Sequence, residues 1–394
     1  MKIVKTSRRE MLKSISKGLG GMALIPSNFL HLAFAEAAQS LLAGSQTHAG
    51  MTEWIVGPYV QISPSYNMNS YSLAYFNLQT GENGRVPIPF RGHGVLKHPN
   101  HSRAVLVMEK GGDKCAEIDL VKRKVSKIIK ADEHSIFYGH GCFSSDGSKL
   151  YTSEHNKETR HGSIRIRNGK TYEPIGEISS YGFQPHDMML IDEGQTVVIA
   201  NHGKSYRRGD QVGEQKTCVA FIDLKSGHLI KKLTAEGHGF ELSHLFLSPE
   251  GQLIVGSLHP PGSKVDGNCA VFVAEKDSLQ KLPLPPDIQN RLKDQCFGMA
   301  IHKESGTLAV TCAKSNVAVF WNYREKIFLK SLESLEPYGI VVSGDRKYFL
   351  ISTLTGVPVW VRTSDLEVET GPHRKLLISN SSHMIDIEFP TRST

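Results

Sequence analysis

A short segment with histidine between two glycines recurs along the chain. Residues 90–96 read FRGHGVL and residues 137–143 read FYGHGCF. Further segments align with these two, each with about four apolar residues followed by a polar turn: FQPHDMMLIDEG, ELSHLFLSPEG, CFGMAIHKESG, PYGIVVSGDRK and, as a weaker copy, SNSSHMIDIEF. The equivalent positions are spaced by 40 to 58 residues, at His93, His140, His186, His244, Met299, Gly339 and His383. An internal repeat of this length constrains the fold strongly.

The repeat predicts the fold class. A second apolar run follows most of the polar turns, as in KLYTSEHN and TVVIANHG, and one or two further strands complete each unit. Four strands in about 40–50 residues is the period of a propeller blade. We therefore expect an all-β protein, a seven-bladed β-propeller of the WD40/YVTN type over residues 52–391. One short helix is expected at residues 286–294.

The two ends of the repeat region are expected to meet. Almost no chain follows the seventh copy, whereas residues 71–90 supply outer strands before the first copy. The N- and C-terminal strands would then share one blade, which closes the ring and leaves no exposed sheet edge.

The first 35 residues are typical of an export signal. They begin with basic residues, continue with a weakly apolar stretch and end on Ala33-Phe34-Ala35, a cleavage pattern. Within them SRREMLK at residues 7–13 resembles the twin-arginine motif. The apolar stretch is too short, and too often interrupted by polar residues and proline, to span a membrane. We expect a cleaved signal at residues 1–35, a linker at 36–51, and a periplasmic protein that does not span the membrane.

Charge and cysteine content exclude several classes. Removing residues 1–35 lowers the formal net charge from +7 to +2, which argues against a nucleic-acid partner. None of the six cysteines stands in a C-x-x-C spacing, so a zinc ribbon, a thioredoxin site and covalent haem are unsupported. In an oxidising compartment some can pair, in a pattern that the sequence leaves open.

The recurring histidines predict a metal site. In a propeller the innermost strand of each blade lines the central channel, so equivalent positions form a ring. Five of them fall on consecutive blades: His383, His93, His140, His186 and His244. Imidazole nitrogen suits iron, copper or zinc. The expected cofactor is therefore a transition-metal ion, iron in the first place and copper in the second, with Glu154, Asp187 and Met299 as supporting residues around the ligands.

Other readings of these residues stay open. In WD-repeat propellers a Gly-His pair is structural and bonds to a Trp-Asp partner, of which Phe320-Trp321-Asn322 is the nearest counterpart. Met299 is either a soft ligand for copper(I) or, as we favour, channel packing. Cys142 is more typical of an inert buried thiol. Four residues on the second strands are individually more typical of solvated loop groups: Glu154, His155, His202 and His259.

Catalytic motifs are missing from the sequence. It has no G-x-S-x-G elbow, no H-E-x-x-H helix, no P-loop and no G-x-G-x-x-G fingerprint. An enzyme of this kind would depend on a metal, and we expect a non-catalytic protein.

The signal, the GHG repeats, YGHGCFSSDGSKLYTSEHN, GFQPHDMMLIDEGQTVVIANHG and the FWN segment together resemble a bacterial family catalogued as domain of unknown function 1513. The likeness covers about residues 50–385. It implies an exported seven-bladed propeller in which His93, His140, His186 and His244 match the family's histidine motifs. The sequence departs from the usual pattern in carrying His155 and His202 on second strands.

The resemblance also implies a cellular setting. Genes of this family accompany imelysin-like lipoproteins and dihaem peroxidase-like proteins, which implies a part in periplasmic iron acquisition. The favoured function is a metal-binding accessory protein that releases its ion as the imidazoles protonate near pH 6. A metal-dependent hydrolase of the lactonase type and a metal-free protein-interaction platform remain as alternatives.

Overall fold

A computed structural model describes nine stretches of the chain: residues 51–61, 69–207, 210–214, 216–235, 241–258, 269–292, 295–333, 336–369 and 383–390. The expected signal peptide, linker residues 36–50 and His259 lie outside these stretches. Within them, no helix is both long and apolar enough to cross a membrane.

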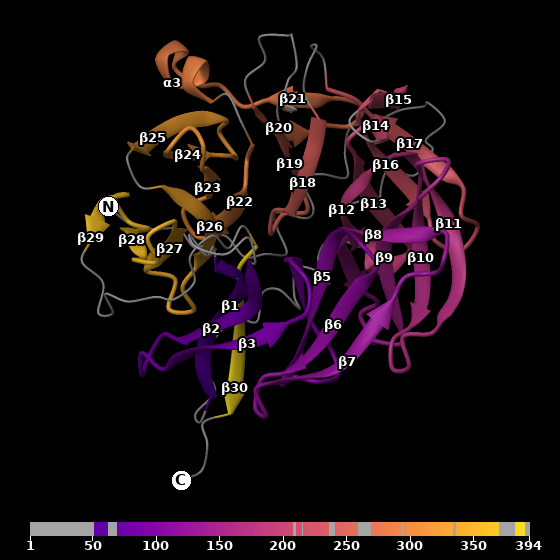
Figure 1. Cartoon of the computed structure of the whole chain (residues 1–394). Helices are drawn as coiled ribbons and strands as arrows, with labels where there is room; N and C mark the ends of the chain where they lie inside the picture. The colour runs from indigo at the N-terminus through magenta and orange to yellow at the C-terminus, as the bar shows by residue number, and fades with distance from the viewer. Residues whose placement is uncertain are drawn as a thin grey trace, which may run out of the picture.

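Antiparallel sheets make up almost all of the described chain, so the all-β prediction is confirmed. The strands group into seven four-stranded units, which follow one another around a common centre (Figure 1). A short pairing between β5 and β8, at Lys110 and Tyr138, joins the second unit to the third. The expected helix is present as α3 (Pro286–Arg291).

The first four units contain the strands up to residue 233, together with the last strand, β30. The first contains β3 (Asn83–Ile88), β2 (Ser70–Asn77), β1 (Met51–Gln61) and β30 (Ile385–Pro390). The second contains β4 (Gly92–Lys97), β5 (Ala104–Gly112), β6 (Lys114–Asp119) and β7 (Lys124–Lys130). The third contains β8 (Ser135–Phe143), β9 (Lys149–Asn156), β10 (His161–Asn168) and β11 (Pro174–Phe183). The fourth contains β12 (Pro185–Ile191), β13 (Thr196–Asn201), β16 (Cys218–Asp223) and β17 (Leu229–Leu233), with the 3-10 turn η1 (Asp192–Gly194) and the hairpin of β14 (Lys204–Arg207) and β15 (Asp210–Glu214).

The remaining three units complete the sequence order. The fifth contains β18 (Glu241–Leu247), β19 (Leu253–Leu258), β20 (Val271–Ala274) and β21 (Leu279–Lys281). The sixth contains β22 (Gly298–His302), β23 (Thr307–Cys312), β24 (Val317–Asn322) and β25 (Ile327–Glu333). The seventh contains β26 (Pro337–Val342), β27 (Tyr348–Thr353), β28 (Val359–Arg362) and β29 (Val368–Glu369).

The two ends of the chain share the first unit, as the sequence predicts. β30 pairs antiparallel with β1, with Trp54 opposite Ile387 and Ile55 opposite Asp386. The backbone N–H of Gly344, in the turn before β27, donates to Oε1 of the buried Glu53 on β1. The first unit therefore contains both the first and the last described strand, and it also bonds to the seventh unit.

Burial explains the strand order within each unit. Every residue of β13, β19 and β23 is buried, because these second strands are covered on both faces by neighbouring sheets. The residues of the outer strands β17 and β25 are almost all exposed or half-buried. The polar turns that follow the inner strands are closed by side chains: in one, Ser144 Oγ lies 2.6 Å from Oδ1 of Asp146 and accepts a hydrogen bond from the backbone of Lys149.

Apolar clusters join each unit to its neighbour. One contains residues of β1, β2 and β3 together with residues of β4, β5 and β6, and similar clusters follow between each later pair of units. A further cluster joins the first unit to the seventh through Ile55 and Phe76 on one side and Leu350 and Trp360 on the other. The described core is thus divided among the interfaces between sheets.

Candidate metal centre

Five histidines from five units meet in one cluster. His93, His140, His186 and His244 lie on the inner strands β4, β8, β12 and β18, and His383 lies just before β30. The ring centroids are 4.3 Å apart for His93 and His383, and 4.6 Å for His140 and His186. The centroid of His244 lies 4.8 Å from those of both His186 and His383. The structure therefore brings together all five histidines that the repeat singled out.

An irregularity in strand pairing recurs at each of the four inner-strand histidines. Between β12 and β13, Pro185 pairs with Asn201 and Met188 with Ile199, so two residues of β12 oppose one of β13. Comparable register shifts occur in β4, β8 and β18. Such a bulge bends the strand and redirects a side chain. In β22, by contrast, Met299 pairs regularly with Val310.

The glycines beside the histidines allow two inner strands to approach closely. A Cβ on Gly94 would lie 2.3 Å from the carbonyl oxygen of Gly139. Gly139 has a φ of +104°, and a Cβ there would lie 2.4 Å from Cδ2 of His93. Only glycine meets both conditions at this contact. The glycines of the Gly-His-Gly motif thus let the backbones and imidazoles of neighbouring inner strands pack closely around one centre.

Several ring nitrogens of the cluster are buried without a protein hydrogen-bond partner. His186 has an exposed fraction of 0%, and neither of its nitrogens is bonded within the protein. Nε2 of the buried His140 is also unbonded. Two sets of three histidines have donor atoms within 4.8 Å of one another: His93, His140 and His383, and His140, His186 and His244. Buried nitrogen lone pairs in such a group fit a metal ion.

Asp187 orients two of these histidines. Its Oδ1 lies 3.2 Å from Nδ1 of His140, and its Oδ2 lies 3.9 Å from Nδ1 of His244. The same carboxylate accepts backbone N–H bonds from Met188 and Leu245. Burial raises the pKa of Asp187, but the two histidines and the backbone donor Leu245 outweigh burial and lower it below its ordinary value. An ionised Asp187 accepts Nδ1–H of His140 and leaves Nε2 as the available ligand atom.

The histidines are held in the neutral form that binds metals. Burial lowers four pKa values well below their usual range, and nearby imidazoles and Lys110 lower them further: those of His93, His186, His244 and His383. Burial also lowers the pKa of Lys110 to about 8. The proposed ion release near pH 6 therefore conflicts with the structure, because these imidazoles resist protonation there.

His202 is a sixth histidine of the cluster. It follows β13, is buried, and its ring centroid lies 4.7 Å from that of His186. Its Nδ1 lies 3.7 Å from a carboxylate oxygen of Glu241, and its Nε2 has no bonded partner. The expectation that His202 is a solvated loop group is therefore wrong. The signal for it was the position of His202 directly after a second strand that contains the apolar run VVIA at residues 197–200.

Glu154 and His155 are also buried, against expectation. Oε1 of Glu154 accepts hydrogen bonds from Arg167 and Thr152, both at 2.7 Å. Nε2 of His155 lies 3.2 Å from Nη1 of Arg160. Each side chain therefore hydrogen-bonds to one arginine of its own unit through one atom, while Oε2 of Glu154 and Nδ1 of His155 are buried without a hydrogen-bond partner.

Three further residues have packing or structural contacts. Met299 packs against an apolar cluster of the fifth and sixth units. Cys142 packs in the cluster between the third and fourth units, and burial raises the pKa of its thiol. Trp321 Nε1 donates to the carbonyl oxygen of Pro283, so it does not serve the histidines as the Trp of a WD repeat would.

Comparison with known proteins gives the family. The chain belongs to the family described as "Protein of unknown function (DUF1513)", which matches residues 86–385. The resemblance seen in the sequence is thereby confirmed. No curated protein that was compared matches the chain.

Comparison with solved structures supports the fold alone. A chain of Kuenenia stuttgartiensis hydrazine synthase is similar, with a TM-score of 0.59 and 17% sequence identity, over 78% of this chain and 96% of that one. A fold match at this identity does not transfer a function.

Proposed function

We propose that this protein binds a transition-metal ion through the histidine cluster, at the centre of a closed seven-bladed β-propeller over residues 52–391. The apolar cluster between the first and seventh units supports closure, as does the pairing of β1 with β30. An open row of sheets would leave one interface unpacked and one edge exposed.

The observation that carries the metal proposal is the pair of imidazoles His140 and His186. Both are buried, and their unbonded nitrogens face a group of further imidazoles. Leaving a buried polar atom without a partner costs about 1–3 kcal/mol. A metal ion bound by these nitrogens removes that cost and supplies the positive charge that their lone pairs favour.

The protein's own residues prepare the site. Burial lowers the pKa values of His186 and His244 and keeps them neutral, so each carries a lone pair at neutral pH. Asp187 fixes the ring orientation of His140 by accepting from Nδ1. His202, with Glu241 beside its Nδ1, has the same arrangement and joins the ligand candidates.

The donor set and the family resemblance point to two ions. Affinity at a nitrogen site generally rises from iron(II) to copper(II) and falls again at zinc. We assign iron on the family's association with iron acquisition, and copper as the second candidate on the nitrogen-rich donor set. Both assignments are proposals that a metal titration decides.

The cellular role extends the same proposal. We place the protein in the periplasm after twin-arginine export, as an accessory of iron acquisition beside imelysin-like or dihaem peroxidase-like proteins. The signal pattern at residues 1–35 and the family resemblance support this role. Export of an already folded chain would let it carry its ion from the cytoplasm.

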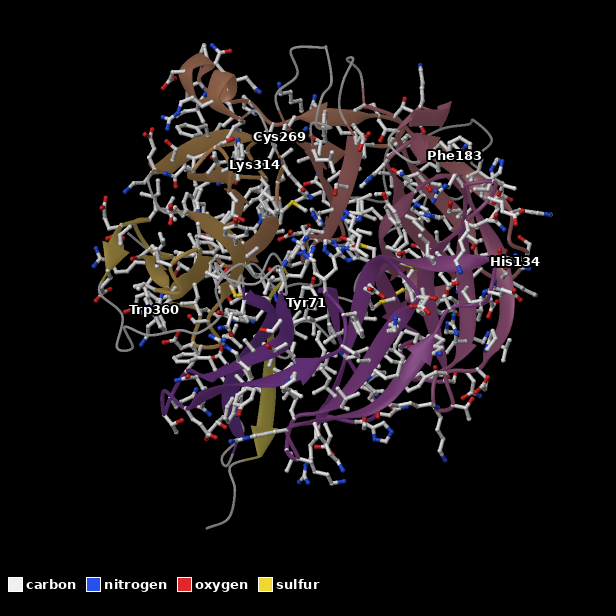
Figure 2. All side chains as sticks on the ribbon, viewed as in Figure 1. Tyr71, His134, Phe183, Cys269, Lys314 and Trp360 are labelled. Carbon is white, nitrogen blue, oxygen red and sulfur yellow. The ribbon has the colours of Figure 1, made fainter. Side chains whose placement is uncertain are left out.

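The test is a titration of the mature protein with Fe(II), Cu(I) and Cu(II). We expect the wild type to bind the ion stoichiometrically at the cluster, and a His93→Ala, His140→Ala, His186→Ala, His244→Ala variant to bind one equivalent less. His134→Ala is the matched control, because His134 is exposed and lies at the outer edge of the molecule (Figure 2). Equal binding by the fourfold variant and the wild type contradicts the proposal.

The hydrolase alternative is not favoured by the site. Lactonase-type sites rely on carboxylates around the ion, whereas Asp187 already accepts two backbone N–H bonds and lies against Nδ1 of His140. We therefore propose a non-catalytic role. Lactone hydrolysis that disappears with chelator and returns with metal would overturn this part of the proposal.

A further inference from the structure

A second group of potential ligands lies in the fifth and sixth units. Cys269 precedes β20, Cys296 precedes β22 and Cys312 ends β23. Their sulfur atoms all lie within 4.8 Å of one another, and Sγ of Cys269 is 3.9 Å from Sγ of Cys312. All three side chains are at most 1% exposed, and no disulfide joins any of the six cysteines, which all lie in the described stretches. Figure 2 shows Cys269 beside β20.

The surroundings of the three thiols are apolar and contain one more sulfur atom. The cysteines belong to the largest apolar cluster of the described chain, with Val310 and Trp321 among its members. A Cβ placed on Gly256 would lie 3.2 Å from Cβ of Cys296 and 3.3 Å from Sδ of Met299, so this thioether and Cys296 flank the same glycine. Four sulfur atoms thus lie close together in the mainly apolar interface between the fifth and sixth units.

We propose that Cys269, Cys296 and Cys312 form a second metal site, which binds copper(I). Metal–sulfur bonds of about 2.3 Å, the value known for zinc, place sulfurs about 4.0 Å apart around a trigonal ion and about 3.8 Å apart around a tetrahedral one. The 3.9 Å between Cys269 and Cys312 fits either arrangement. The sulfurs therefore need little movement to bind an ion.

The number and kind of ligands select copper(I). Thiolate and thioether ligands favour copper(I), zinc and iron–sulfur clusters. Structural zinc is almost always bound by four ligands, and an iron–sulfur cluster by four cysteines. Three thiols and a nearby thioether in a buried pocket suit a soft ion that accepts low coordination, which copper(I) does.

Binding exchanges protons for the ion without electron transfer. Hydrogen bonding with Cys269, together with burial, raises the pKa values of Cys296 and Cys312 well above their ordinary range. An apolar core tolerates such neutral thiols better than it tolerates thiolates without an ion. Copper(I) enters as copper(I), thiolates form, and their protons leave to water.

The thiol site adjoins the histidine cluster but does not depend on it. Gln295, the residue before Cys296, has its Nε2 3.5 Å from Nε2 of His244. The two sites differ in ligand chemistry, because one is nitrogen and the other sulfur. Substitutions in one set of ligands can therefore test one site while leaving the other in place.

The experiment is an anaerobic titration of the full mature protein with copper(I), in competition with a coloured copper(I) chelator. We expect the wild type to retain copper(I) with the ultraviolet absorption of a copper–thiolate complex. Cys296→Ala and Cys312→Ala should each lower the affinity for copper(I) by more than 10- to 100-fold, which is the loss typical when a residue that only hydrogen-bonds to a metal ligand is replaced. Cys115→Ala, at an equally buried cysteine between other units, is the control and should bind as the wild type does.

Two outcomes separate this site from the histidines. The fourfold histidine variant should keep the copper–thiolate absorption, even if it loses all other metal binding. Equal retention by Cys296→Ala and the wild type, or displacement of copper(I) by equimolar zinc, overturns the proposal. X-ray absorption spectroscopy of the wild-type protein with one equivalent of copper(I) does not depend on the folding of any variant. Sulfur atoms bound to the copper would support the site, and nitrogen atoms alone would contradict it.

Discussion

Asp187 shows how one side chain links the fold to the proposed site. It stands on β12, accepts the backbone N–H of Leu245 on β18, and holds Nδ1 of His140 from β8. Three units therefore meet at one carboxylate. Its ionised form is favoured by these donors, so the group acts both as a bond between sheets and as the partner of a ligand.

Replacing Asp187 by asparagine is expected to weaken metal binding by about 10- to 100-fold, because His140 loses the anion that fixes its tautomer. The chain should still fold, since an amide oxygen can accept one of the two backbone bonds. Affinity is measured by competition with a chelator. Glu173→Gln, at an exposed carboxylate, is the control. An unchanged affinity for D187N would show that Asp187 is only structural.

At the scale of the strand, the inner strands combine a bulge with glycine contacts. The strand pairing is interrupted at each of these histidines, by one extra residue in β4 and by two in β8, and the glycines at the β4–β8 contact let two backbones meet. Neither feature alone would place imidazoles from neighbouring units side by side. The GHG motif therefore encodes packing as well as ligands.

Gly94→Ala is expected to destabilise the protein by about 1–3 kcal/mol, because its Cβ would overlap the carbonyl of Gly139, which is backbone and cannot rotate away. Gly176→Ala is the matched control, since its nearest neighbour, Cδ1 of Ile166, would lie at an ordinary 3.6 Å. Urea unfolding followed by circular dichroism measures both. Similar midpoints for the two variants would mean that the close contact is not rigid.

At the scale of the whole molecule, β30 connects the ends of the chain. It supplies the fourth strand of the first unit, and the adjacent His383 lies in the cluster, with its Nε2 3.2 Å from Nε2 of His93. Stability and the proposed site should therefore both depend on the last strand.

A chain ending at residue 382 is expected to lose both properties. Without β30, β1 becomes an exposed edge, the buried Ile387 is missing, and the cluster lacks His383. We expect the melting temperature to fall by about 10 °C or more, which corresponds to a loss on the order of several kcal/mol in the free energy of unfolding. Metal binding should also be weaker. A chain ending at Pro390 keeps β30 whole and is the control. If both chains melt alike, β30 does not close the fold.

Acidification provides a second test of the whole molecule. Five histidines with strongly lowered pKa values, His202 included, stay neutral in the folded chain but protonate near pH 6.5 once unfolded. Unfolding then takes up protons, so stability is full above pH 6.5 and falls as the pH drops below it, by up to about 1.4 kcal/mol per pH unit for each group.

Glu53 acts in the opposite direction. Burial raises its pKa to about 7, so it stabilises the folded chain as the pH falls from 7 towards 4.5. The effect of this one carboxyl is smaller than the combined effect of the five imidazoles. We therefore expect the melting temperature of the metal-free protein to decrease as the pH is lowered from 7 to 5. The fourfold histidine variant should show a flatter decrease and Glu53→Gln a steeper one. A wild-type melting temperature that is constant or rises over this range would contradict the assignment.

The repeat made much of the fold predictable. Apolar runs of strand length, separated by polar turns at a steady interval, specify antiparallel sheets whatever their neighbours are. The position of His93, His140, His186, His244 and His383 at the same point of each copy also predicted that they would meet. These inferences succeed because they depend on periodicity, which a sequence displays directly.

Contacts between units were decided by the tertiary structure. The bulges that turn the histidines inward, the burial of His202, and the pairing of Glu154 with Arg167 depend on how each sheet faces the next. The grouping of Cys269, Cys296 and Cys312 has no sequence spacing that signals it. The physical reason is that a repeat fixes the phase of each strand, whereas the distances between side chains of different units follow from the angle and separation at which the sheets pack.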